Sequence, residues 1–207
     1  MGLKNVHFED QLLENAQLEL SDKEALYYLG PRLVLRHCTL VLRVPAQRLH
    51  FPGPKFIGCT IEVKRELQEL SWYTTFLTGC RFTGRLTGCD FGHWPDPKSW
   101  PNTEEGGIED CDFTAAQLHL CRFVGCDMNT LRLPRWPCFT LEAPFRRRHE
   151  LASRPWPGKL GGWIRSFELY PETTVAVTLS AAELAKESAI EEEAIRAALT
   201  GLDGVFY

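Results

Sequence analysis

Cysteines and large apolar residues alternate with polar residues along the central part of the chain. Seven segments share the order cysteine, any residue, hydrophobic residue, and they are residues 38–40, 59–61, 80–82, 89–91, 111–113, 121–123 and 126–128. Because β-strand residues two positions apart face the same side, each segment directs its cysteine and its hydrophobic side chain inward. The pattern predicts short strands around a common core.

The spacing of these segments is regular in two places. Intervals of 21 residues separate the first three cysteines, Cys38, Cys59 and Cys80. Shorter intervals of 10 and then 5 residues separate Cys111, Cys121 and Cys126. Fixed periods are typical of stacked coils, in which each repeat buries its apolar face only against its neighbours. The sequence therefore predicts a solenoid of short parallel strands, with the first strand beginning at Cys38.

Residues 89–91, 111–113 and 126–128 each carry cysteine, then aspartate, then phenylalanine or methionine. This order resembles the pentapeptide-repeat family, whose pattern is a small residue, Asp or Asn, a central Leu or Phe, and two looser positions. The resemblance covers residues 33 to 141 and implies a right-handed quadrilateral β-helix. Since the five-residue register is unbroken only between Cys121 and Cys126, we expect a mainly β fold with a short, irregular right-handed parallel β-helix.

The remaining parts of the chain are expected to form additional segments attached to this solenoid. We expect an N-terminal lead-in over residues 1–30, the β-helix with an inserted loop at 92–107 over residues 31–145, and a basic linker with an acidic helical pair over residues 146–207. With 207 residues, of which 44% are hydrophobic and 24% charged, the chain can bury a sizeable core. It has no apolar run of transmembrane length and no signal-peptide pattern, so we expect a cytoplasmic protein that does not enter a membrane.

Without an export signal, the cysteines are expected to remain free thiols that pack as small buried hydrophobes. The alternative is a zinc site in which Cys121 and Cys126 join Cys111, Cys138 or His119. No closely spaced Cys-x-x-Cys pair occurs, and the repeat already explains the cysteine spacing. Core packing is therefore the favoured interpretation, with no metal and no cofactor.

Residues 92–107 interrupt the repeat. They contain three prolines and three glycines in sixteen residues, which predicts an irregular loop. The loop contains Trp94, Trp100, Glu104 and Glu105, and we interpret it as a candidate recognition surface. The alternative is an insertion that only covers the edge of the solenoid.

Charge changes sign along the C-terminal third. Residues 132–165 contain eight Lys or Arg against two Glu, and residues 168–207 contain eight acidic against two basic residues. The run at 146–148 consists of three arginines and raises the hypothesis of nucleic-acid binding. The tryptophans of this segment, Trp136, Trp156 and Trp163, lie beside Pro or Gly and form no stacking platform, and the acidic segment can neutralise the basic one. We therefore expect a solvated or internally paired basic face.

The sequence pattern of the C-terminal segment predicts two short helices that meet near Ser188. Ser180 with Glu183 forms a capping box, Ser188 with Glu191 suggests a second one, and Gly201 supplies a stop. Residues 179–201 resemble a helix-turn-helix. Three carboxylates, Glu191, Glu192 and Glu193, stand where the recognition helix would meet DNA and would repel phosphate. An acidic helical pair, packed on the β-helix or presented to a basic partner, is the better interpretation.

No catalytic motif is evident. The six histidines are scattered, and no phosphate-binding loop or nucleophile motif occurs, so we expect the protein not to be an enzyme. A soluble solenoid with an acidic tail suits a binding protein.

The run rich in Arg, Trp and Pro near Trp136 and the closing residues 201–207 resemble pentapeptide-repeat-like immunity proteins that bacteria make beside polymorphic or type VI secretion toxins. The resemblance implies an immunity protein that neutralises its cognate secreted toxin by occlusion. For a nuclease toxin with a basic cleft, acidic groups would provide complementarity. The expected contact residues are Trp94, Trp100, Glu104, Glu105, Glu109, Asp110, Glu191, Glu192 and Glu193. The alternatives are a DNA mimic that engages a topoisomerase and a DNA-binding regulator that uses the C-terminal helices.

Overall fold

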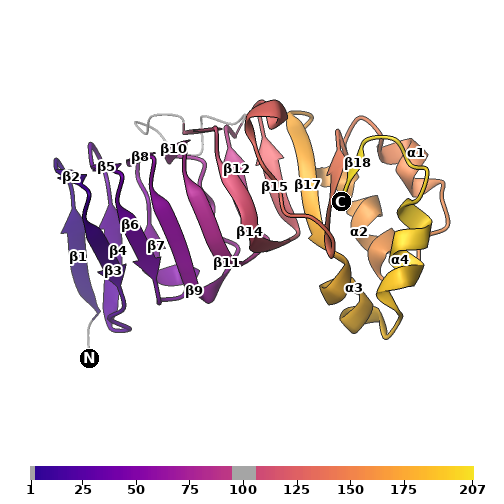
Figure 1. Cartoon of the computed structure of the whole chain (residues 1–207), viewed down its shortest axis with the longest axis horizontal. Helices are drawn as coiled ribbons and strands as arrows, with labels where there is room; N and C mark the ends of the chain where they lie inside the picture. Colours follow the sequence, from indigo (N-terminus) through magenta and orange to yellow (C-terminus); the bar gives the residue numbers. More distant parts are fainter. Residues whose placement is uncertain (1–2, 95–105) are drawn as a thin grey trace.

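The computed structural model describes residues 3–94 and 106–207. It shows a mainly β protein in which a parallel β-solenoid of about four turns leads into a mixed sheet with helices. Figure 1 shows the solenoid running from the N-terminus toward the helices, which gather at the opposite end. In the described part of the chain, no helix is both long enough and apolar enough to cross a membrane.

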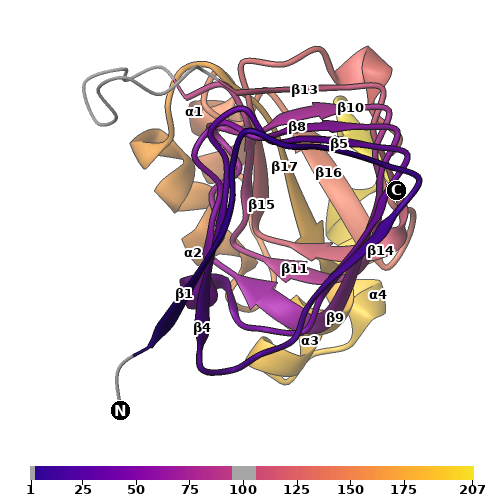
Figure 2. The same ribbon diagram turned by 90° about the vertical axis from the view of Figure 1, so that its left-hand side faces the viewer.

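Three parallel sheets, which we call A, B and C, surround the solenoid core (Figure 2). Sheet A contains β1 (Lys4–Phe8), β4 (Ala25–Leu29) and β7 (Leu49–His50). Sheet B contains β2 (Leu12–Glu14), β5 (Val34–Arg36), β8 (Lys55–Ile57), β10 (Phe76–Thr78) and β13 (Gly107–Glu109). Sheet C contains β3 (Gln17–Leu20), β6 (Thr39–Leu42), β9 (Thr60–Gln68), β11 (Arg81–Thr87) and β14 (Asp112–His119).

A fourth sheet, D, joins the solenoid to the helices. Its strands follow the order β12 (Asp90–Gly92), β15 (Cys121–Val124), β17 (Thr174–Ser180), β16 (Cys138–Glu142) and β18 (Val205–Phe206). Strands β12 and β15 are parallel, whereas β17 pairs antiparallel with both β15 and β16. The parallel stacking of this side of the solenoid therefore ends at β17.

The helical elements are short. The α-helices are α1 (Arg148–Ala152), α2 (Leu160–Arg165), α3 (Ala181–Ser188) and α4 (Glu192–Leu199). The 3-10 turns include η1 (Ala46–Arg48), η3 (Met128–Thr130) and η4 (Ser166–Leu169). Residues from α1–α4, β16 and β17 share a second hydrophobic core that includes Phe139, Val177, Leu184 and Ile195. We call residues 134–207 the C-terminal module.

Seven of the eight cysteines form two internal ladders, and the repeat predicted that such cysteines face inward. In the first, each thiol donates a hydrogen bond of 3.2–3.6 Å to a carbonyl of the preceding coil, and the donors are Cys38, Cys59, Cys80 and Cys111. In the second, Cys89, Cys121 and Cys138 do the same at 3.3–3.6 Å. All eight cysteines are free, and all are buried except the half-buried Cys126. These bonds satisfy thiols that have no access to water.

Stacked aromatic rings fill the core beside the cysteines. Phe82 and Phe113 stack with 4.5 Å between ring centroids, and Phe91 stacks on Phe123 at 5.4 Å. Trp72 contacts both Phe82 and Phe91. The hydrophobic third position of these four repeats therefore places one ring over another in successive coils. At the 21-residue interval the third positions Leu40, Ile61 and Phe82 are in register on β6, β9 and β11, so one coil takes 21 residues there.

The solenoid begins earlier than the cysteine pattern predicts. Strands β1–β3 lie within residues 1–30, and β3 pairs in parallel with β6, so the expected start at Cys38 is wrong. The first coil lacks a cysteine because Ala16 occupies the position equivalent to Cys38, where its carbonyl accepts the N–H of Thr39 at 2.9 Å. This inward position is thus occupied by a small residue in each of these coils, alanine in the first and cysteine in the next.

The predicted pair of C-terminal helices is confirmed, with one correction. The Ser180 hydroxyl accepts the Glu183 N–H at 3.3 Å and caps α3. Ser188, however, ends α3 instead of capping α4, and its hydroxyl accepts the N–H of Lys159 at 2.9 Å. The second capping box is therefore wrong. Residues 133–141 carry two prolines followed by an apolar run, which predicts a turn into a last strand. The strand exists as β16, but it is not the last one, because β17 and β18 follow it.

Candidate functional site

Trp94, one of the expected contact residues, is packed onto the solenoid. Its ring lies 4.7 Å from that of Tyr73, and the Arg122 guanidinium lies 5.9 Å from its centroid. Arg122 also forms a bidentate ion pair with Asp90 and lies 5.1 Å from the Tyr170 ring. Trp94 thus covers a partly buried ion pair.

The other expected contact residues fall into two separate groups. Glu109 ends β13 and Asp110 follows it at a corner with a φ of 53°, and both are exposed. Glu191 and Glu193 are exposed at the start of α4, with Glu192 half-buried between them. Figure 2 shows β13 on the opposite side of the molecule from α3 and α4, so the structure does not bring these groups together. Trp100, Glu104 and Glu105 lie outside the described residues.

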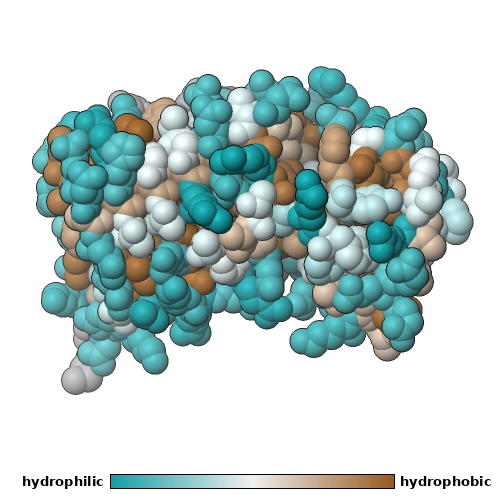
Figure 3. Space-filling model, viewed as in Figure 1, coloured by the Kyte–Doolittle hydropathy of each residue, from teal (hydrophilic) through white to brown (hydrophobic). Residues whose placement is uncertain are grey.

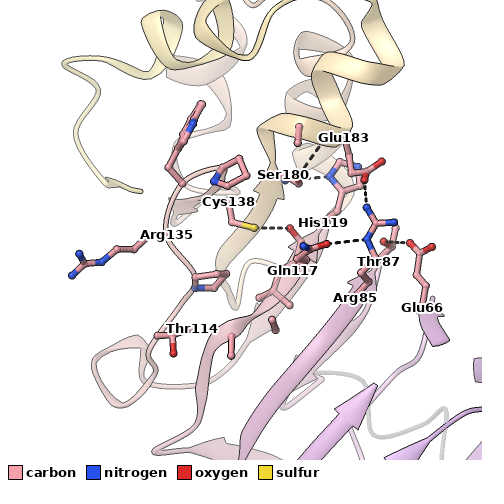
Figure 4. Close-up of a pocket in the computed structure, with 17 residues that line it drawn as sticks. Glu66, Arg85, Thr87, Thr114, Gln117, His119, Arg135, Cys138, Ser180 and Glu183 are labelled. Atoms are coloured by element: carbon pink, nitrogen blue, oxygen red, sulfur yellow. Dashed lines mark hydrogen bonds and ion pairs between the residues drawn. The ribbon is translucent and has the colours of Figure 1, made fainter. Parts of the chain in front are cut away.

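A hollow of about 470 Å³ lies where the solenoid meets the C-terminal module. Its walls come from β11, β14, the turn at residues 134–138 and the start of α3, and we call it the junction hollow. Figure 3 shows the surface hollowed between the solenoid and the helices, with hydrophilic side chains over much of the viewed solenoid. The side chains that line the hollow are drawn in Figure 4.

Arg85 links the two sides of the junction hollow. Its Nε donates to Gln117 Oε1 at 2.9 Å, and its Nη2 donates to Glu183 Oε1 at 2.6 Å (Figure 4). Beside it, the Thr87 hydroxyl donates to Glu66 Oε1 at 2.7 Å. Arg85 therefore ties β11 of the solenoid to the first turn of α3. Arg135 points away from the other labelled side chains.

His119 forms a second link at the end of β14. Its Nδ1 accepts the N–H of Ser180 at 3.2 Å, so the neutral ring carries its proton on Nε2. Nε2 lies 3.8 Å from Glu187 Oε1 and makes no hydrogen bond, although the side chain is only 6% exposed. Burial lowers the pKa of His119, and the nearby Glu187 and Glu183 carboxylates oppose this effect. The ring is consequently a neutral structural contact between solenoid and helix.

The junction hollow lacks an activated nucleophile among its described lining residues. The only thiol that lines it belongs to Cys138, which donates to the Leu118 carbonyl at 3.5 Å, and burial raises its pKa. A protonated thiol held in this way is unreactive. Among the lining side chains, the carboxylates of Glu66 and Glu183 and the amide of Gln117 can accept hydrogen bonds from a cationic or polar group, and Arg85 and Arg135 supply donors. The hollow therefore suits binding.

The structure places two cysteines of the alternative zinc site in different ladders. Cys111 belongs to the first cysteine ladder and Cys121 to the second, and each thiol is directed at a carbonyl of its own ladder. Across residues 3–94 and 106–207, no group of three or more His, Cys, Asp or Glu side chains is arranged to hold a metal ion.

Glu191, Glu192 and Glu193 add negative charge to the start of α4, whereas α3, its neighbour in the helix pair, lines the junction hollow. None of the three forms an ion pair with another described residue. We call these three residues the acidic triplet. The sequence pattern indicates the triplet but not the junction hollow, because Arg85 and His119 approach α3 only through long-range packing. Of the residues that link the two sides, Glu183 alone has a role in the sequence pattern, and that role is helix capping.

The fold alone does not fix the function, since solenoids serve many binding roles. No protein-family model matches the chain, and no curated protein matches its sequence. The chain is shown to be a parallel β-solenoid of about four turns with a C-terminal module, and its function must be inferred from its surface chemistry.

Proposed function

We propose that the protein is an immunity protein that binds a cognate secreted bacterial toxin, of the nuclease class, and neutralises it by occlusion. The observation that carries the proposal is the acidic triplet at the start of α4, which has no ion-pair partner among the described residues and belongs to the helix pair whose other member, α3, lines the junction hollow. A nuclease must present a cationic surface to nucleic acid, and an acidic protein surface can cover it.

The triplet is suited to guiding a basic partner. Exposed carboxylates mainly raise the association rate, because their field acts over distances of about 8–10 Å in physiological salt. The acceptors in the hollow then offer a second, more enclosed set of contacts. Glu183 and Glu66 are held by Arg85 and Thr87, yet each carboxylate retains lone pairs that can accept from an arginine or lysine side chain.

The two alternative functions receive less support. A DNA mimic requires a continuous acidic face, whereas several carboxylates on the outer solenoid surface pair with cations, as in Arg36–Glu14 at 2.8 Å and Lys64–Glu62 at 2.7 Å. A DNA-binding regulator requires a recognition helix that tolerates phosphate, but α4 begins with the acidic triplet.

The proposal is tested by co-expressing the chain with the toxin domain encoded beside its gene and by measuring host survival and binding kinetics. We expect the wild type to protect the host, and the double variant Glu191→Lys, Glu193→Lys to associate about tenfold or more slowly. Glu24→Lys is the matched control, because Glu24 is exposed near the N-terminal end of the solenoid.

Two outcomes would contradict the proposal. In the first, the wild type neither binds the toxin domain nor protects the host. In the second, the folded double variant binds with the same association rate as Glu24→Lys at low salt, which would remove the acidic triplet from the interface.

A further inference from the structure

The outer side of sheet A carries a stack of three rings, of which His7 and His50 are exposed and Tyr28 between them is half-buried. The rings of His7 and Tyr28 lie 4.7 Å apart with an angle of 6° between their planes, and Tyr28 and His50 lie 4.9 Å apart at 14°. These residues are in register on β1, β4 and β7, so one ring lies over the next along the solenoid axis. Tyr28 covers one face of the His50 ring, and the stack of rings ends at His50 on the side of the next coil.

Among the described residues, no ring of the next coil stacks on His50, whose one ring partner is Tyr28. Sheet A ends at β7, and the chain next pairs on this side through the parallel bridge between Ser71 and Asp90. Asp90 is in turn in register with Arg122. Ser71 is exposed and has a small side chain, so the level that follows His50 is left open. We call it the open level.

A cavity of about 550 Å³ lies at the open level. Tyr28 and His50 line it from two successive coils, and Ser71, Tyr73 and Leu70 line it from the coil after His50. Apolar atoms make up most of its surface, and the amides of Gln47 and Gln68 add polar groups. A cavity of this size, mainly apolar with a few polar groups, is typical of a ligand-binding site.

We infer that this cavity receives an aromatic side chain of a protein partner, whose ring stacks on His50 in the open level. The inference rests on the proposed function, because it assigns the anchor residue of the partner. Aromatic side chains that enter such pockets dominate the affinity of protein interfaces.

The lining chemistry favours a protein side chain over a nucleotide. Glu69 is the only Asp, Glu, Lys or Arg residue among the described lining residues, so the site offers no cation for a phosphate. The glutamine amides and the Thr74 hydroxyl can bond to a peptide backbone next to the inserted ring. Tyr73 packs against Trp94, which makes that wall rigid before the partner binds.

The test is an NMR titration of the full chain with N-acetyl-tryptophanamide as the probe. We expect saturable shifts at His50, Tyr28 and Ser71. Ser71→Phe fills the open level with a ring of its own and should weaken probe binding at least tenfold, whereas Ser71→Ala should bind as the wild type does. His50→Ala removes the stacking surface and should also weaken binding, which provides a second test if Ser71→Phe does not fold.

Adenosine monophosphate serves as the competing probe. The inference is overturned if this nucleotide binds more tightly than N-acetyl-tryptophanamide, if the shifts map elsewhere, or if Ser71→Phe binds the probe as well as Ser71→Ala does. These measurements need no toxin, so their failure leaves the proposed neutralisation intact. With the toxin domain itself, Ser71→Phe should raise the dissociation rate, while the double variant of the acidic triplet lowers the association rate.

Discussion

Removing one ring from the stacked core should destabilise the solenoid strongly. Phe82 is fully buried, stacks on Phe113 at 4.5 Å, and makes edge contacts with Trp72 and Phe91 at 5.5 and 5.6 Å. Replacement of a buried phenylalanine by alanine costs about 3–5 kcal/mol, because a cavity remains where the ring was. We expect Phe82→Ala to lower the free energy of unfolding by this amount. Phe76→Ala is the matched control, since Phe76 faces outward on β10 and is only half-buried.

The assay is equilibrium unfolding in urea, followed by tryptophan fluorescence and by far-ultraviolet circular dichroism. With a denaturant dependence of about 3 kcal/mol per molar, the midpoint of Phe82→Ala should fall by about 1–2 M. The Phe76→Ala midpoint should fall by less than about 0.3 M. If the two variants unfold within about 1 kcal/mol of each other, the ring stack does not stabilise the solenoid as we argue.

Three further predictions concern the thiols, the histidine and the helix cap. Native alkylation at pH 8 should be slow for all eight cysteines and fastest at the half-buried Cys126, whose pKa burial raises to about 12; rapid labelling of the ladder cysteines would contradict the ladder. Because burial lowers the pKa of His119 from 6.5, the unfolded state binds more protons below about pH 6.5, so the free energy of unfolding should fall as the pH drops through this value. His119→Gln should flatten this dependence, and an unchanged pH profile would refute the assignment. Ser180→Ala should cost about 1 kcal/mol and speed amide exchange at the start of α3, whereas Ser188→Ala should leave that exchange unchanged.

The repeat of cysteines was sufficient to predict the parallel coils and their buried thiols. Each cysteine is followed two residues later by an inward hydrophobic side chain, and this local pattern is what the strand geometry requires. The first coil was missed because Ala16 fills the corner without a cysteine, so the signal by which the coils were recognised is absent there. The resemblance to pentapeptide repeats predicted the solenoid, while membership of that family remains a hypothesis.

The C-terminal module shows what local patterns cannot reveal. Residues 174–180 are rich in β-branched residues, which is a strand signal, but their antiparallel pairing with both β15 and β16 depends on contacts far apart in sequence. The junction hollow has the same origin, because Arg85 and Glu183 meet across 98 positions. The acidic triplet was visible in the sequence, whereas its separation from Glu109 and Asp110 followed only from the fold.

The strand pairing also fixes the distance between positions on successive coils along the solenoid axis. Ser71, Asp90 and Arg122 occupy three successive levels on the same side, and β17 pairs beside the last of them. Since neighbouring strands lie about 4.8 Å apart, two steps place the open level about 10 Å along the axis from the Arg122 level, and β17 of the C-terminal module pairs beside that level. A partner that contacts both the open level and the C-terminal module must therefore span a fixed number of strand spacings along the solenoid axis.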